Sequence, residues 1–221
     1  MFFVTSWLEY PRMEIHAPEK PILTVKEAAA HLAIVTVGIL IALSLEGIVE
    51  YVHHRAVVRE AREIMRHEIE ENRAELDKVL GHIKDTQIKE MTHGVEVMQA
   101  LIAHESSDTK LMINYSRASL QSAGRTTAEL MGAFAYMDHN DVGRWAAVYD
   151  LQQEFVRTQS AALVDGTAAF SFLMKRDLLK TPPAQLETEA ETLRHAVGTL
   201  VVLTQLGEAL RAKYNEILGA P

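Results

Sequence analysis

Two glutamate–histidine pairs are the residues best suited to chemistry, and each pair is spaced by four positions: Glu63 with His67, and Glu191 with His195. Four residues make about one helical turn, so each pair shares a helix face and offers metal-binding oxygen and nitrogen atoms. Di-iron bundles use a spacing of three, with both side chains projecting inward. Both pairs here lie among other charges, which is typical of a solvated face. We therefore expect no metal or other cofactor, and the alternative is a metal-binding or enzymatic bundle using these four residues.

No other catalytic pattern is present. The chain has no cysteine, which excludes disulfides, thiolate metal sites and cysteine nucleophiles. It contains no glycine-rich nucleotide loop, no H-E-x-x-H and no G-x-S-x-G motif. We expect no enzymatic activity and assign no catalytic or cofactor-binding residue.

Composition indicates a folded, helical chain that does not bind nucleic acid. Hydrophobic residues make up 48% and charged residues 24%, while glycine (11) and proline (6) are scarce, a balance that favours helices. The net charge of −8 argues against binding to phosphate backbones, which needs a basic surface.

A long apolar run near the N-terminus predicts one transmembrane helix at residues 28–49, preceded by a tail at residues 1–27. No formal charge occurs between Glu27 and Glu46. As a helix the segment is about 33 Å long, enough for a hydrocarbon core of about 30 Å. The alternative is a buried core helix, but such helices carry apolar runs of about 10–14 residues. His53 and His54 follow the run as interfacial polarity.

One face of this predicted span indicates helix pairing. Gly38 and Ala42 form a small-xxx-small pair, which lets a second helix approach closely. The face also carries polar groups near its ends, and comprises His31, Val35, Gly38, Ala42 and Glu46. It predicts a homo-oligomer or a partner in a membrane complex. The alternative is a solitary anchor whose His31 and Glu46 reach the headgroups.

Residues 50–221 are predicted to form an extramembrane helical domain, because apolar residues recur at spacings of three, four and seven. The spacing predicts that the span continues as a long stalk, interrupted near Gly81 or Gly94 and ending at a polar break over 104–110. The apolar positions of this stalk are Ile48, Val52, Val58, Ala61, Met65, Ile69, Leu76, Val79, Leu80, Ile83, Met91, Val95, Met98 and Leu101.

One short helix and two further long helices complete the predicted domain. Thr126 and Glu129 form a capping box that predicts a short helix through Tyr136, and Asp138 can cap the helix after it. The later helices have inward positions that include Trp145, Tyr149, Gln152, Phe155, Leu186, Leu193, Leu210 and Tyr214. The fold class is therefore all-α: one N-terminal transmembrane helix that continues into a stalk, with an up-and-down helical bundle outside the membrane.

Several segments carry a resemblance to a known group. They are MEIHAPEKPI at Met13–Ile22, HLAIVTVGILIALSLEGIVE at His31–Glu50, HHR at His53–Arg55, and the block Ala128–Phe155. The chain resembles uncharacterised bacterial single-pass membrane proteins with an M-E-[IV]-H-x-P start and a G-I-L-I-A-L span. The resemblance implies the bacterial inner membrane, a periplasmic body, a start at Met13 that makes residues 1–12 an upstream extension, and no known activity.

These observations give a functional expectation. We expect a membrane-anchored helical interaction protein, serving as a scaffold or accessory subunit, whose partners are the lipid bilayer and another membrane helix. The basic residues that flank the span do not decide its orientation, because Arg12, Lys20 and Lys26 oppose Arg55, Arg59, Arg62 and Arg66.

Overall fold

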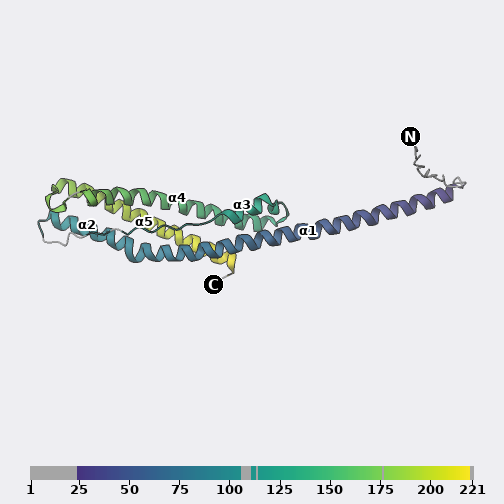
Figure 1. The fold of residues 1–221 in the computed structure, drawn as a ribbon, viewed down its shortest axis with the longest axis horizontal. Coiled ribbons are helices and arrows are strands. Elements are labelled where there is room, and N and C mark those ends of the chain that lie inside the picture. Colours follow the sequence, from purple (N-terminus) through teal and green to yellow (C-terminus); the bar gives the residue numbers. More distant parts are fainter. Residues whose placement is uncertain (1–23, 106–110, 113, 176, 220–221) are drawn as a thin grey trace, which may run out of the picture. The chain divides into compact units, whose positions relative to one another are not determined.

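The computed structural model describes residues 24–105, 111–112, 114–175 and 177–219, and their side chains except those of residue 170 and residues 172–175. Most of the expected tail and part of the expected polar break lie outside these residues. The elements in chain order are α1 (Val25–His82), a π-helical turn η1 (Ile83–Gln87), α2 (Ile88–Ile102), α3 (Ala123–Leu130), the 3₁₀ turn η2 (Ala133–Tyr136), α4 (His139–Lys175), the 3₁₀ turn η3 (Leu178–Lys180) and α5 (Pro183–Leu218) (Figure 1). The described residues contain no strand, so the predicted all-α class is confirmed.

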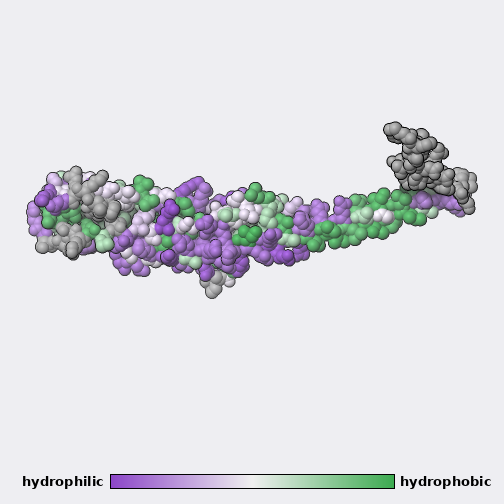
Figure 2. All heavy atoms as spheres, in the orientation of Figure 1, coloured by the Kyte–Doolittle hydropathy of each residue, from purple (hydrophilic) through white to green (hydrophobic). Residues whose placement is uncertain are grey.

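The chain divides into two compact units at Val52 and His53, within α1. In the first unit, α1 begins after Thr24, whose hydroxyl oxygen accepts a hydrogen bond from the Glu27 amide at 3.3 Å. The helix therefore starts three residues before the predicted position 28, because Thr24 supplies an N-cap. All described side chains of this unit are exposed, and hydrophobic groups cover this part of α1 (Figure 2).

The second unit, His53–Pro221, is the helical bundle. Ile48 and Val52 share the apolar spacing of the stalk, but each is 59% exposed. The buried stripe begins at Val58 and continues through Met65 and Leu76. Periodicity alone could not locate this boundary, because an apolar residue has the same spacing whether a bundle or lipid covers it.

The stalk changes its winding close to the predicted interruption. Residues Ile83–Gln87 form a π-helical turn that joins α1 to α2 without a break in the helix. Gln87 is buried there, and its amide has no hydrogen-bond partner among the described residues. A π-turn accommodates one extra residue. The local change follows Gly81 by two residues, and no such turn occurs at Gly94.

Successive segments of the bundle alternate in direction, and one of these segments is not a helix. Residues 114–122, which we call the strap, run back along α1 and α2: Asn114 bonds to Glu90, and Gln121 bonds to Asn72. Helix α4 then runs parallel to α1, and α5 returns antiparallel to both, with Arg73 on α1 bonding to Asn215 on α5. The predicted up-and-down bundle is thus completed by an extended segment (Figure 1).

The start of α3 differs from the predicted capping box. Helix α3 begins at Ala123, and the Thr126 hydroxyl donates to the carbonyl of Ser122 at 3.2 Å instead of accepting from Glu129. The capping-box prediction was therefore wrong, because the helix begins before Thr126. The predicted cap at Asp138 is confirmed, since its carboxylate accepts from the Asn140 amide at 2.8 Å.

Two glycines of α5 give a stability prediction with opposite signs. A Cβ on Gly207 would lie 2.5 Å from Leu80 Cδ2 and 3.1 Å from Phe155 Cε2, both in the core. Gly207→Ala is expected to lower the free energy of unfolding by about 1–3 kcal/mol, since overpacking outweighs helix propensity. A Cβ on Gly198 would meet nothing within 4 Å, so Gly198→Ala should raise it by about 0.5–1 kcal/mol. Denaturant unfolding measures both, and shifts of the same sign would contradict the packing argument.

Candidate functional site

The first predicted glutamate–histidine pair lies on the exposed surface of α1. Glu63 and His67 are both exposed. The imidazole of His67 lies 3.4 Å from Glu71, one turn further along the helix, and not against the carboxylate of Glu63. The structure therefore places the first pair among solvated charges.

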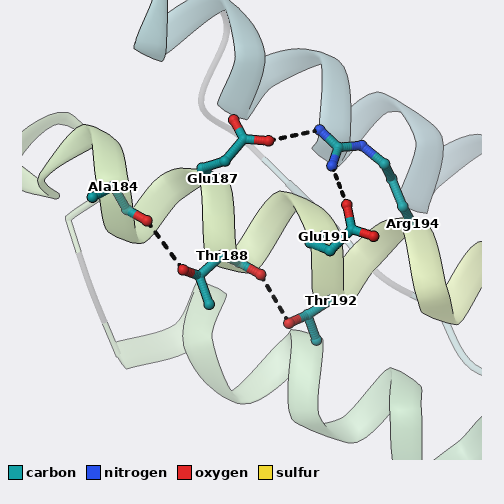
Figure 3. Close-up of polar contacts among 6 residues, drawn as sticks. All are labelled: Ala184, Glu187, Thr188, Glu191, Thr192 and Arg194. Carbon is teal, nitrogen blue, oxygen red and sulfur yellow. Dashed lines mark hydrogen bonds and ion pairs between the residues drawn. The ribbon is translucent and has the colours of Figure 1, made fainter.

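The second pair lies on α5 among local ion pairs. The carboxylates of Glu187 and Glu191 both point toward the Arg194 guanidinium, while Thr188 and Thr192 bond back to the helix backbone (Figure 3). His195 is exposed, and its Nε2 lies 3.6 Å from Asp165 on α4. Within the described ranges, no group of three or more histidines, aspartates and glutamates is placed to hold a metal ion.

The predicted pairing face lies in the exposed part of α1. His31, Val35, Gly38, Ala42 and Glu46 are all exposed, and a Cβ on Gly38 would meet nothing within 4 Å. The face is open to a second helix. The hydroxyls on the same segment are satisfied within the helix: Thr36 donates to Leu32 at 2.8 Å, and Ser44 donates to Leu40 at 2.7 Å.

A network of buried, hydrogen-bonded polar side chains joins the helices of the bundle. At one end, Glu68 on α1 is buried and uses both carboxylate oxygens. One oxygen accepts from the Tyr149 hydroxyl on α4 at 2.7 Å, and the other accepts from the Gly124 amide in the first turn of α3 at 2.6 Å. A carboxylate at a helix N-terminus is favoured by the free amides and the helix dipole. Glu68 therefore fixes α3 and α4 to α1.

Gly124 makes this contact possible. A Cβ there would lie 3.2 Å from the Glu68 carboxyl group, closer than ordinary van der Waals contact. The absence of a side chain lets the α3 backbone approach the buried carboxylate.

Asn72 and Gln152 hold the strap at its centre. The Asn72 side chain donates to the Gln121 carbonyl at 2.8 Å and accepts from the Gln121 amide at 2.7 Å. Gln152 donates to the same carbonyl at 2.7 Å, and its oxygen accepts from the Tyr214 hydroxyl on α5 at 2.6 Å and from Asn72 at 3.2 Å. These side-chain amides replace the backbone partners that an extended segment would find in a sheet.

Gln159 repeats this arrangement two turns along α4. Its oxygen accepts from the Ala118 amide at 2.8 Å, and its nitrogen donates to the Ala118 carbonyl at 3.0 Å. The Tyr115 hydroxyl donates to the backbone carbonyl of Gln159 at 3.2 Å. The strap is thus held to α1 by the paired amide contacts of Asn72 and to α4 by those of Gln159.

The chemistry of this network is stabilising. Both oxygens of Glu68 are occupied, and the amides of Asn72, Gln152 and Gln159 bond to the strap. A pocket of about 370 Å³ lies beside the network. It is lined by Leu120, Ser122, Arg125, Thr126, Glu129, Tyr149, Gln152, Gln153 and Val156. Arg125 in this pocket bonds to Glu129 at 2.9 Å. The arrangement positions the strap.

The buried tyrosines predict a loss of stability at high pH. Burial raises the pKa of Tyr115 to about 12, and burial also raises the pKa values of Tyr149 and Tyr214. The unfolded chain releases these protons near pH ~10, so the folded state binds more protons above that pH and its stability falls as pH rises. We expect these three of the six tyrosines to ionise together with the loss of helix, measured by tyrosinate absorbance and circular dichroism.

A single substitution provides a control for this alkaline titration. Tyr115→Phe removes one of the groups with a raised pKa, so it should move the unfolding transition to higher pH. Ionisation of all the tyrosines near pH ~10 with no loss of helix would contradict the assignment.

Sequence reasoning found part of this network. Tyr149, Gln152 and Tyr214 were predicted to point inward and are buried, as predicted. Glu68 and Asn72 were missed, although a signal for them was present. They stand at the apolar spacing of three and four between Met65 and Leu76, so a polar residue occupies a position that the period assigns to the core.

Comparison with known protein families, with curated proteins and with solved structures gave no match to this chain.

Proposed function

We propose that this protein is anchored in a membrane by α1 and that its bundle acts through protein contacts, as a scaffold or an accessory subunit. The observation that supports the anchor is the exposed apolar part of α1 in the first unit of the chain. It contains an apolar stretch long enough to cross a bilayer, and none of that stretch is buried in the fold. An exposed apolar surface of this extent is costly in water and favourable in lipid.

The internal hydrogen bonds of this segment support the same proposal. Lipid offers no hydrogen-bond partners, so a spanning segment must satisfy its polar groups internally. The hydroxyls of Thr36 and Ser44 do so through the helix backbone. By resemblance, the proposed location is the bacterial inner membrane with the bundle in the periplasm. Labelling of Leu179→Cys in intact cells by an impermeant maleimide would test the side.

Resistance to extraction tests the anchor. We expect the full chain to remain in the membrane pellet through alkaline carbonate washing and to be released by detergent. A peripheral protein of the same preparation provides the control, because carbonate should remove it. Recovery of the chain in the carbonate supernatant would contradict the proposal.

The proposal of contact through α1 rests on the open face around Gly38 and Ala42. Close packing drives helix association in lipid, because lipid and leucine are equally apolar. Single cysteines at 35, 38 and 42 should crosslink between copies in membranes, and cysteines at 33 and 40 on the opposite face should not. The chain has no native cysteine to interfere.

A bulky side chain on that face provides the matched test. Gly38→Ile should abolish crosslinking at position 42, whereas Leu40→Ile should leave it unchanged, because only the first variant blocks the close approach. Uniform or absent crosslinking at all five positions would indicate a solitary anchor or a different partner helix.

A further inference from the structure

The turn that follows α3 is unusual in its composition. Residues 130–137 read Leu-Met-Gly-Ala-Phe-Ala-Tyr-Met, a run without a formal charge. Gly132 makes the turn with a φ of 68°, in the left-handed region that glycine adopts without strain. Turns at the end of a soluble bundle are usually polar. We call residues 130–137 the apolar turn.

The apolar turn has an inner and an outer side. Ala133 and Met137 are buried in the core. Leu130 and Tyr136 face outward: Leu130 is 85% exposed, more than any other large apolar side chain of the described bundle, and Tyr136 is 51% exposed. Packing in the core explains why the inner residues of the turn are apolar. It does not explain the apolar residues on the outer side, which the bundle leaves exposed.

The contacts of Tyr136 place this turn beside the chain segment that enters the bundle. Its ring stacks on the imidazole of His54, with centroids 3.6 Å apart and planes 14° from parallel. His54 follows Val49, the last residue of the proposed span, by five positions of the same helix. Five residues correspond to about 7.5 Å of helix rise, and the headgroup layer on each side of the core is about 5–7.5 Å thick, so His54 lies near the outer edge of that layer.

We propose that the apolar turn is a second membrane contact, at which Leu130 and Tyr136 enter the lipid interface. The proposal rests on the membrane anchoring proposed above. Tyrosine is enriched at the interface, because its ring is apolar and its hydroxyl is polar. A lipid surface is the occupant that continuity with α1 indicates. A turn fixed to the bilayer would limit the tilt of the bundle and set which of its faces partners can reach.

Depth-dependent quenching tests this contact in the full chain. The cysteine of the Leu130→Cys variant is labelled with an environment-sensitive fluorophore. The labelled chain is reconstituted in vesicles of phosphatidylcholine and phosphatidylglycerol that contain lipids spin-labelled near the headgroup. Leu179→Cys is the matched control, because Leu179 is 70% exposed and lies beyond the far end of the 37-residue α4. Ile41→Cys, within the proposed span, reports anchoring.

The expected result is a blue-shifted emission and a loss of fluorescence for the label at 130, and no change for the label at 179. If the label at 41 responds to deeply spin-labelled lipids while the label at 130 behaves like that at 179, the second contact is wrong and the anchor stands. If the label at 41 also shows no response, the anchor itself fails. A label at 130 that is blue-shifted without lipid quenching would indicate a protein partner and would overturn the lipid contact.

Discussion

Glu68→Leu is expected to remove a large part of the stability of the bundle. The substitution leaves the Tyr149 hydroxyl and the Gly124 amide without their acceptor in the core. Each of the two buried donors left unpaired costs about 1–3 kcal/mol, so we expect a loss of about 2–6 kcal/mol in the free energy of unfolding. Domains of this class have only about 5–15 kcal/mol in total. Denaturant unfolding followed by circular dichroism measures the change.

Two variants control for other effects of this substitution. Glu70→Leu changes an exposed carboxylate two positions away that pairs only with Arg66 on its own helix among the described contacts, and it should shift stability by less than about 0.5 kcal/mol. Glu68→Gln keeps one acceptor for Gly124 and should have an intermediate effect. If Glu68→Leu were as mild as Glu70→Leu, the network would not hold α3 and α4 to α1.

The apolar period made the helical part of the fold predictable. Spacings of three and four assigned Met65, Phe155 and Leu210 to the core, and all three are buried. This signal is strong because a helix presents the same face every few residues, whatever it packs against. For the same reason the period could not distinguish the exposed Ile48 and Val52 from the buried Val58.

The strap could not be predicted from the same signal. Its residues have no apolar period, because the segment is extended and its bonds come from distant side chains such as Asn72 and Gln159. Helices α1 and α4 lie on either side of the strap only in the folded chain, so the sequence of the strap does not identify them as its partners. A polar residue on an apolar stripe, such as Gln87 or Asn72, was the available sign that the core contains polar groups.

The glutamate–histidine pairs show what residue spacing can and cannot predict about a functional site. Their four-residue spacing places each pair on one helix face, yet His67 lies near Glu71 and His195 near Asp165. Whether such residues converge on one point depends on the rotation of each helix in the bundle, which the spacing within one helix does not encode. The neighbouring charges were the more informative feature, because they marked both faces as solvated.

Charge placed in the middle of the apolar segment of α1 should release the protein from the membrane. Val37 and Leu40 lie near the centre of residues 28–49, outside the face of Gly38 and Ala42, and both are exposed. An aspartate at the centre of a spanning helix costs about 2.5–3.5 kcal/mol. The double variant Val37→Asp with Leu40→Asp therefore loses about 5–7 kcal/mol of insertion free energy, roughly a 10⁴-fold change in partitioning.

The measurement is the fraction of chain that carbonate extracts, together with gel filtration of the extracted material to exclude aggregates. Val37→Leu with Leu40→Ile keeps the segment apolar and should remain in the pellet, and Leu179→Asp places a single aspartate on an exposed site of the bundle and should have no effect. The bundle should stay folded in all three, because the described residues 24–52 of the first unit are all exposed and Leu179 is itself 70% exposed. Retention of the double aspartate variant in the pellet, in a form that detergent still releases as a folded protein, would mean that α1 does not cross the bilayer and that another part of the chain holds it there.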